Sequence, residues 1–142
     1  WSPTGSRSIL EFFVNELSAG NQVRGFTDFT VTSIYAQHLA EAIWNLTKSE
    51  ATGILNVASR DALSKYEFGT LVADQFDLPA GLISPVMSDP NSIPPRSRDL
   101  SLNTDKVASI LGLPSPGQQE GISQAFADSA TLRSRIHSPR DA

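Results

Sequence analysis

The 142-residue sequence contains no cysteine, so it can form neither a disulfide nor a thiolate metal site. Its two histidines, His38 and His137, are not at metal-ligand spacing and leave little material for a Ser-His-Asp triad. No apolar run approaches the roughly 20 residues that span a bilayer. We therefore expect no metal site and no membrane segment, and take the cytoplasm only as the default location.

The motifs that bind phosphates or carry nucleophiles are also missing. There is no G-x-G-x-x-G string, no phosphate-binding P-loop and no G-x-S-x-G elbow. The chain starts at Trp1, and its first residues are neither a start methionine nor a signal peptide. We expect no catalytic and no cofactor-binding residue here, and we expect the chain to be part of a longer protein.

The bulk composition is that of an ordinary globular domain. With 39% hydrophobic and 18% charged residues, the chain has enough apolar side chains for one core. Its net charge of −4 lacks the basic excess of a general nucleic-acid binder. We expect one domain over residues 1–133 and a flexible tail over 134–142.

Short strands and helices alternate along the sequence. Capping boxes at Ser8 and Ser64 predict two helix starts, and Gly20 and Gly112 predict two helix ends. The expected helices are residues 9–19, Ala36–Thr47 with an inward face of Leu39, Ile43 and Leu46, 65–76, 104–111 and Gln118–Arg133. The expected strands are Val23–Phe26, Gly53–Ala58, Leu82–Met87 and a short one at Leu100 and Leu102, with loops over Asp28–Ser33 and Ser88–Pro95. This order indicates an α/β or α+β fold with too few strands for a complete doubly wound domain.

Several blocks of the sequence occur in the order known from one enzyme family. They are Gly25–Asp28, Tyr35–Ile43, Gly53–Ala58, Leu63–Phe68, Arg96–Leu102 and Lys106–Gly112. Together they resemble the C-terminal part of extended short-chain dehydrogenases/reductases, in particular the dTDP-4-dehydrorhamnose reductases. The resemblance implies an NAD(P)-dependent oxidoreductase whose nucleotide-sugar substrate binds to this part of the protein.

The same resemblance implies that the cofactor loop and the catalytic Tyr-x-x-x-Lys lie in a Rossmann part upstream. Neither Tyr35 nor Tyr66 has a lysine four positions on. We therefore expect this portion to be inactive alone, and leave open whether the parent protein is an active enzyme.

Candidate substrate-binding residues follow from the resemblance. Arg96 follows a Pro-rich loop and is implied to face the diphosphate of the sugar nucleotide, a role that suits a guanidinium fork. The alternative is a surface arginine paired with Asp89 or Asp99. Arg98 is a second candidate for the same role.

Trp1, Phe26 and Asp28 are implied to line the same cleft. Trp1 could stack on a substrate ring or simply pack against a helix, and Asp28 could instead form a turn with its own backbone. His38 is interpreted as a surface or capping residue. A basic cluster in the tail is interpreted as a solvated segment, with an acidic partner as the alternative.

The sequence departs from the family pattern at Val31, Ser33, His38 and Ser97. These departures keep a second function open, a non-catalytic subunit such as the β-subunit of methionine adenosyltransferase. A free-standing interaction module is a third. Exposed sheet edges and apolar surface on a split domain also predict self-association as a homo-oligomer.

Overall fold

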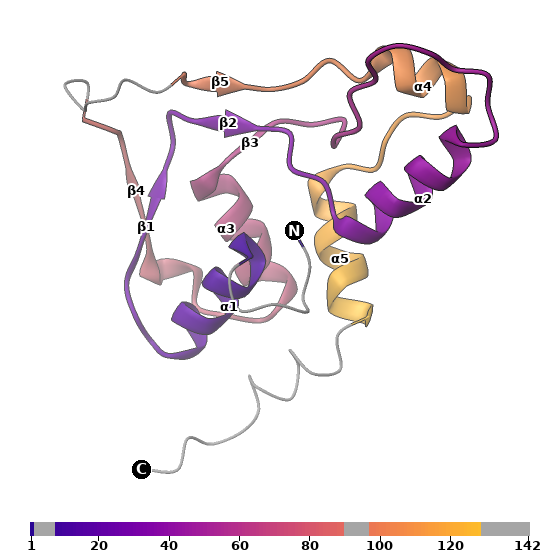
Figure 1. Cartoon of the computed structure of the whole chain (residues 1–142). Coiled ribbons are helices and arrows are strands. Elements are labelled where there is room, and N and C mark those ends of the chain that lie inside the picture. Colours follow the sequence, from indigo (N-terminus) through magenta and orange to yellow (C-terminus); the bar gives the residue numbers. More distant parts are fainter. Residues whose placement is uncertain (2–7, 90–96, 129–142) are drawn as a thin grey trace.

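The computed structural model describes residues 1, 8–89 and 97–128 (Figure 1). The elements are α1 Ile9–Ser18, β1 Val23–Phe26, β2 Thr30–Val31, α2 Ala36–Leu46, β3 Leu63–Ser64, α3 Lys65–Gln75, the 3-10 turn η1 Ala80–Leu82, β4 Ile83–Val86, β5 Asp99–Leu100, α4 Asp105–Leu111 and α5 Gln118–Asp128. Helices and short strands alternate, so the chain is α/β, as expected. None of the described helices is long and apolar enough to cross a bilayer.

The strands form two small sheets. β1 pairs in parallel with β4, with Val23 opposite Ile83 and Phe26 opposite Val86. In the second sheet β2 is central, antiparallel to β3 and parallel to β5. The second sheet lies above α1 and α3 in Figure 1, and the β1–β4 pair lies beside these helices. The two sheets meet at the short connection from β1 to β2.

The core lies between α1, α3, α5 and the β1–β4 pair. Phe13 of α1 and Phe68 of α3 are buried with ring centroids 6.4 Å apart, and Phe76 meets Phe126 of α5 at 5.0 Å. Gly69 permits the close approach of α1 to α3, because a Cβ at this position would come within 2.3 Å of the Phe13 ring. The helix starts are as expected from the capping boxes: Ser8 accepts from the amide of Glu11, and Ser64 from that of Glu67.

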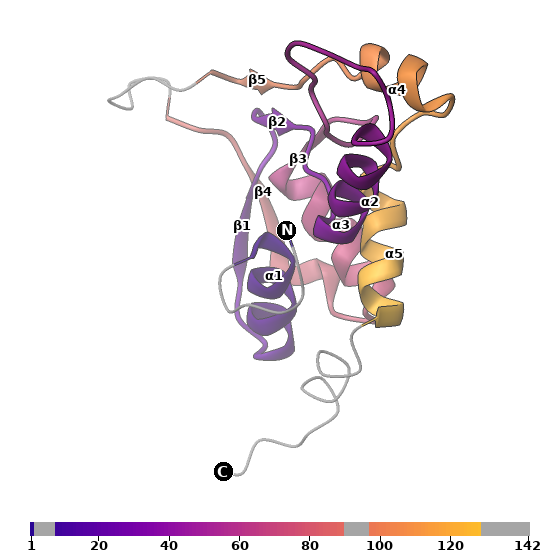
Figure 2. The same cartoon turned by 45° about the vertical axis from the view of Figure 1, so that its right-hand side comes forward.

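Helices α2 and α4 stand apart from this core. They lie together at one corner of the molecule in both views (Figure 2), and the connection from α2 to β3 runs over α4. α2 has no buried residue, so its expected inward face is wrong in part: Ile43 is 50% exposed. Gly112 ends α4 with a positive φ of 72°, as predicted.

Several local predictions need correction or restriction. Gly53–Ala58 is not a strand in the described chain. The expected loop over 28–33 contains β2, which the sequence did not predict because a strand of two residues has no periodic pattern. β5 ends before Leu102, and β3 was not expected. Residues 90–95 of the expected loop, 129–133 of the expected last helix, and the tail at 134–142 lie outside the described residues.

Candidate functional site

A cavity of about 650 Å³ opens where the two sheets meet helices α1 and α3. Every strand except β4 contributes to it, and the segment just after β4 completes one side. Its lining residues are Ile9, Arg24, Phe26, Phe29, Val31, Ser33, Leu63, Ser64, Lys65, Phe68, Met87, Ser88, Asp89, Ser97, Leu100 and Gln118. A concave site with an apolar lining and a few polar groups is the usual form of a small-molecule site.

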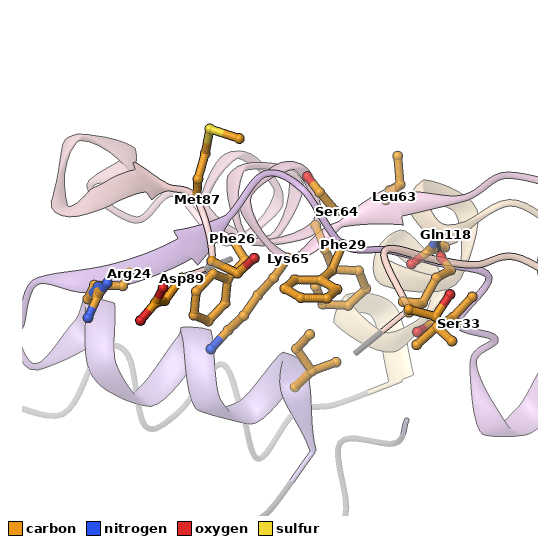
Figure 3. Close-up of a pocket in the computed structure, with 16 residues that line it drawn as sticks. Arg24, Phe26, Phe29, Ser33, Leu63, Ser64, Lys65, Met87, Asp89 and Gln118 are labelled. Atoms are coloured by element: carbon orange, nitrogen blue, oxygen red, sulfur yellow. Dashed lines mark hydrogen bonds between the residues drawn. The ribbon is translucent and has the colours of Figure 1, made fainter. Parts of the chain in front are cut away.

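One end of the pocket has charged side chains, and the other end has neutral polar ones. Arg24 and Asp89 lie at one end in Figure 3, and Ser33 and Gln118 lie at the other. Phe26, Phe29 and Lys65 lie between them. An elongated ligand with a charged group and a polar group would therefore meet different side chains along its length.

Two phenylalanines form an aromatic wall in the middle of the pocket. The rings of Phe26 and Phe29 pack edge to face, with centroids 6.0 Å apart and planes at 88°. Phe26 ends β1, and Phe29 follows two turn residues later, so the turn presents both rings to the same space. Such a wall suits a flat ring, because aromatic pairs stack or meet edge to face.

Lys65 lies between the two ends of the pocket (Figure 3). It is the first residue of α3, and its Nζ lies 4.3 Å from the ring centroid of Phe12 and 5.8 Å from that of Phe13. Burial lowers the pKa of the Lys65 ammonium, since desolvation disfavours the charged form. A bound anion would offset that loss of hydration.

Gln118 fixes the opposite end of the pocket. Its buried side chain donates through Nε2 to the carbonyl oxygens of Val31, at 2.9 Å, and Asp61, at 3.1 Å. Its own backbone amide donates to Asp61 Oδ1 at 2.9 Å. These bonds join the start of α5 to β2, so this wall of the pocket is held by elements distant in sequence.

Asp28 supports the pocket from its rim. Its carboxylate accepts hydrogen bonds from the backbone amide of Ser88, at 3.1 Å from both oxygens, and from Ser88 Oγ at 2.5 Å. The Ser88 hydroxyl and amide lower the pKa of the Asp28 carboxyl, with a weaker contribution from the charge of Arg98. Asp28 therefore connects the β1–β2 turn to the segment that follows β4.

The candidates from the sequence are distributed around this pocket. Phe26 lines it, and Asp28 holds the lining residue Ser88. Arg98 is exposed and is not a lining residue, although its carbonyl oxygen accepts from the amide of Thr30 beside β2. Arg96 lies outside the described residues. Binding of substrate by these residues stays a prediction.

Trp1 lies against the core outside the pocket lining. Its ring centroid is 5.1 Å from that of Tyr35 and 5.5 Å from that of Phe68, which itself lines the pocket. Gly121 of α5 makes room, since a Cβ there would come within 3.1 Å of the indole. This position agrees with packing on a helix, and contact of Trp1 with a substrate ring stays a prediction. His38 packs edge to face on Tyr35, with centroids 5.4 Å apart.

Several lining residues were not expected from the sequence. Arg24 had a usable signal, because it lies two positions before Phe26 in an expected strand and so shares its face. Lys65 and Ser64 were interpreted only as the start of a helix. Phe29, Met87 and Gln118 enter the pocket through long-range packing that has no local signal.

The described residues hold no metal cluster and no dinucleotide loop. No group of three or more His, Asp or Glu side chains in the described part of the chain is placed to bind a metal ion. The turn from β3 into α3 has no glycine, and Ser64 and Glu67 already occupy its first free amides. A cofactor pyrophosphate therefore does not fit this strand–helix junction.

Comparison with known proteins assigns this chain to a family. The profile of the RmlD substrate-binding domain matches residues 4–131. The chain belongs to this family. An RmlD substrate-binding domain is thus what the ordered sequence blocks predicted.

Relatives of this RmlD substrate-binding domain include one curated protein and several solved structures. The probable low-salt glycan biosynthesis reductase Agl14 of Haloferax volcanii is 30% identical over 122 residues, which cover 83% of this chain and 41% of that protein. A hypothetical dTDP-4-dehydrorhamnose reductase from Sulfolobus tokodaii is 27% identical with a TM-score of 0.68, covering 81% of this chain and 41% of the other.

The same fold occurs in the dTDP-4-dehydrorhamnose reductase of Bacillus anthracis in complex with NADP. There the TM-score is 0.78 at 15% identity, over 91% of this chain and 45% of that one. The chain thus spans less than half the length of each of these three relatives.

Proposed function

We propose that this RmlD domain is the substrate-binding portion of an NAD(P)-dependent nucleotide-sugar reductase similar to dTDP-4-dehydrorhamnose reductase. The observation that carries the proposal is the pocket: Phe26 and Phe29 offer a wall for a base or sugar ring, and Arg24 and Lys65 offer cations for a diphosphate. Arg96 and Arg98 are proposed as further diphosphate contacts, as the resemblance implies.

The domain's share in the reaction is to bind and orient the sugar nucleotide. Holding a substrate in a reactive geometry is itself a large part of catalysis. The nicotinamide cofactor would supply the hydride, and we propose that it binds to a Rossmann part of the full-length protein. The domain alone is then expected to be inactive.

A thermal-shift experiment with dTDP, dTDP-glucose and free glucose tests the proposal on the full-length protein. A ligand at about 100 times its Kd stabilises the protein that binds it by about 2.7 kcal/mol. We expect a clear rise in melting temperature with dTDP-glucose, a smaller one with dTDP and none with free glucose. Equal melting temperatures in all samples would contradict the proposal.

Arginine variants test which cations bind the diphosphate. Arg24→Ala and Arg96→Ala are expected to weaken dTDP binding roughly tenfold or more, because each removes a charge-assisted hydrogen-bond donor. Arg98→Ala is expected to have a smaller effect, because its side chain is exposed and does not line the pocket. Unchanged affinity in Arg96→Ala would remove the role implied by resemblance.

Agl14 and the reductases from Bacillus anthracis and Sulfolobus tokodaii are all named as reductases. The non-catalytic subunit is therefore not favoured as the function. The cytoplasmic location, the domain boundary at residue 133 and the homo-oligomer stay predictions. Analytical ultracentrifugation over a range of concentrations tests the last of these, and a monomer throughout would contradict it.

A further inference from the structure

Gln118 is a buried amide whose side-chain oxygen has no partner in the described part of the chain. The residue is only 1% exposed. Both hydrogens of Nε2 are donated, one to the carbonyl oxygen of Val31 and one to that of Asp61. No hydrogen bond from a described residue reaches Oε1. A buried amide oxygen without a donor is costly, so this atom needs an explanation.

The two carbonyl oxygens fix which way the Gln118 amide is turned. An amide nitrogen has two hydrogens to donate, whereas an amide oxygen can only accept. The flipped amide would place Oε1 against the carbonyl oxygens of Val31 and Asp61, and three acceptors would then face one another without a hydrogen. Oε1 is therefore the atom of this amide that is left for a ligand.

The backbone around Gln118 is held as firmly as its side chain. Asp61 Oδ1 accepts from the backbone amide of Gln118 at 2.9 Å, and the Asp61 carbonyl also accepts from Ser59 Oγ at 2.7 Å. Arg60, next to Asp61, forms an ion pair with Glu120 of α5. Oε1 is thus an acceptor in a fixed position, and a preorganised group binds its ligand without a further cost of ordering.

The Gln118 oxygen opens to the pocket between the two sheets. Gln118 lines that pocket, whereas a second hollow, beside Arg60, is lined by Gln119 and not by Gln118. The fully enclosed side-chain atoms that lack a partner among the described residues are Trp1 Nε1 and His38 Nδ1. Gln118 Oε1 is not one of them, so it keeps access to the pocket.

An acceptor at this end of the pocket discriminates between the parts of a sugar nucleotide. The diphosphate is ionised and only accepts, so it gains nothing from Oε1 and is matched by the cations of Arg24 and Lys65. A flat base is matched by the wall of Phe26 and Phe29. The end at Gln118 suits a neutral group that donates a hydrogen bond, and the hydroxyl groups of the hexose are such donors.

We propose that Gln118 Oε1 accepts a hydrogen bond from a hydroxyl group of the hexose, and that Gln118 is thereby a specificity-determining residue for the sugar. A site that hydrogen-bonds a substrate hydroxyl rejects analogues without it, because the polar group of the protein is then left unpaired. The inference rests on the proposed function, which makes the ligand a sugar nucleotide. It adds which end of the pocket the sugar occupies and which atom recognises it.

Fluorinated ligands test the proposal on the full-length protein. In a series of dTDP-glucose analogues, each hexose hydroxyl in turn is replaced by fluorine, which donates no hydrogen bond. We expect at least one analogue to bind wild type roughly tenfold more weakly than dTDP-glucose in isothermal titration calorimetry, because Oε1 loses its donor. Equal affinity for all members of the series would overturn the proposal, and this comparison depends on no variant.

Glutamine variants assign the lost hydrogen bond to its acceptor. Gln118→Met removes the amide and keeps an unbranched side chain of similar length, and Gln119→Met makes the same change at the exposed neighbouring position. Gln118→Met should bind the weakened analogue as tightly as dTDP-glucose, while Gln119→Met should retain the full difference between the two ligands. A difference that persists in Gln118→Met would place the acceptor elsewhere and overturn the proposal.

Gln118→Lys is a second variant, which keeps donors at this position. Its ammonium retains hydrogens for the carbonyl oxygens of Val31 and Asp61 but offers no acceptor. We expect it to be as indifferent to the fluorine as Gln118→Met. Melting temperatures without ligand report whether each variant is folded, and a fluorine effect of wild-type size in folded Gln118→Lys would contradict the proposal.

Binding of dTDP distinguishes the hexose from the rest of the nucleotide. Since dTDP has no hexose, Gln118→Met should bind it with the affinity of wild type. Equal losses of dTDP and dTDP-glucose affinity in Gln118→Met would assign the donor to the base or the deoxyribose and overturn the proposal.

The same measurements separate this inference from the proposed function. A full-length protein that binds no dTDP-glucose would remove the proposed function and this inference with it. Tight binding of dTDP-glucose without any fluorine effect would remove the role of Gln118 and leave the proposed function standing.

Discussion

Helices α2 and α3 have the same length of eleven residues but very different surroundings. α3 buries Phe68, Val72 and other residues between α1, α5 and β1, whereas α2 has no buried residue. Both helices show apolar residues at helical spacing in the sequence. Apolar periodicity thus indicates which face of a helix is suited to packing, but not how deeply that face is buried.

The largest expected effect is a difference in unfolding free energy between a substitution in the core and one on the exposed face of α2. Phe13→Ala removes a fully buried ring from the contact between α1 and α3 and should lower the free energy of unfolding by about 3–5 kcal/mol. Ile43→Ala on α2 should change it by less than about 0.5 kcal/mol in this 142-residue chain. Urea unfolding of both variants measures the difference, and equal losses would break the comparison.

A smaller effect is expected from overfilling the same core. Gly69→Ala would place a methyl group against the buried Phe13 ring, and we expect a loss of about 1–3 kcal/mol in spite of the better helix propensity of alanine. Gly81→Ala is the control, because a Cβ there meets no atom within 4 Å. Thermal unfolding compares the two, and similar melting temperatures would show that the ring moves aside.

The start of α1, in the core, has a side-chain cap, whereas the start of α4, outside the core, has none at its N-cap residue. We therefore expect the N-cap residue to matter more for stability in α1 than in α4. The Ser8 hydroxyl accepts from the Glu11 amide at the start of α1, so Ser8→Ala should cost about 1 kcal/mol. Thr104 precedes α4 without such a bond, and Thr104→Ala should change stability by only a few tenths of a kcal/mol, as is usual for surface substitutions. Denaturant midpoints measure both, and a larger loss at Thr104 would contradict the assignment.

The smallest effect concerns pH at the rim of the pocket. The pKa of Asp28 is lower in the folded protein than in the unfolded chain, so the folded state binds fewer protons. Its stabilising contribution is therefore present above the ordinary aspartate pKa of about 4 and is lost as the pH falls through the folded value. Between neutral pH and about pH 3, wild type should lose slightly more stability than Asp28→Asn. Parallel curves would argue against the bonds to Ser88.

Local chemistry made much of the fold predictable, and long-range pairing did not. Ser8 and Ser64 specify helix starts within one turn, and Gly112 specifies an end by its positive φ. β2 has only two residues, and its partners β3 and β5 lie far along the chain, so no periodic pattern identifies it.

The candidate site was less predictable for the same reason. Phe26 was found through the resemblance, but Lys65 and Gln118 belong to helices whose pattern describes only their own local structure. Their convergence on one cavity depends on how the two sheets meet, and pattern analysis of single elements does not contain that information. The predicted strand at 53–58 failed because a strand needs a neighbour as well as a suitable composition.

Met87 is the only methionine of the chain, and it lines the pocket with its side chain 67% exposed. A protein labelled with ¹³C at methionine methyl groups would therefore give a single side-chain resonance from this chain, and it would originate at the pocket. Entry of a ligand should shift that one signal, whatever the rest of the molecule does. The same sulfur makes the cavity sensitive to oxidation, since a sulfoxide would place a polar group in an apolar wall.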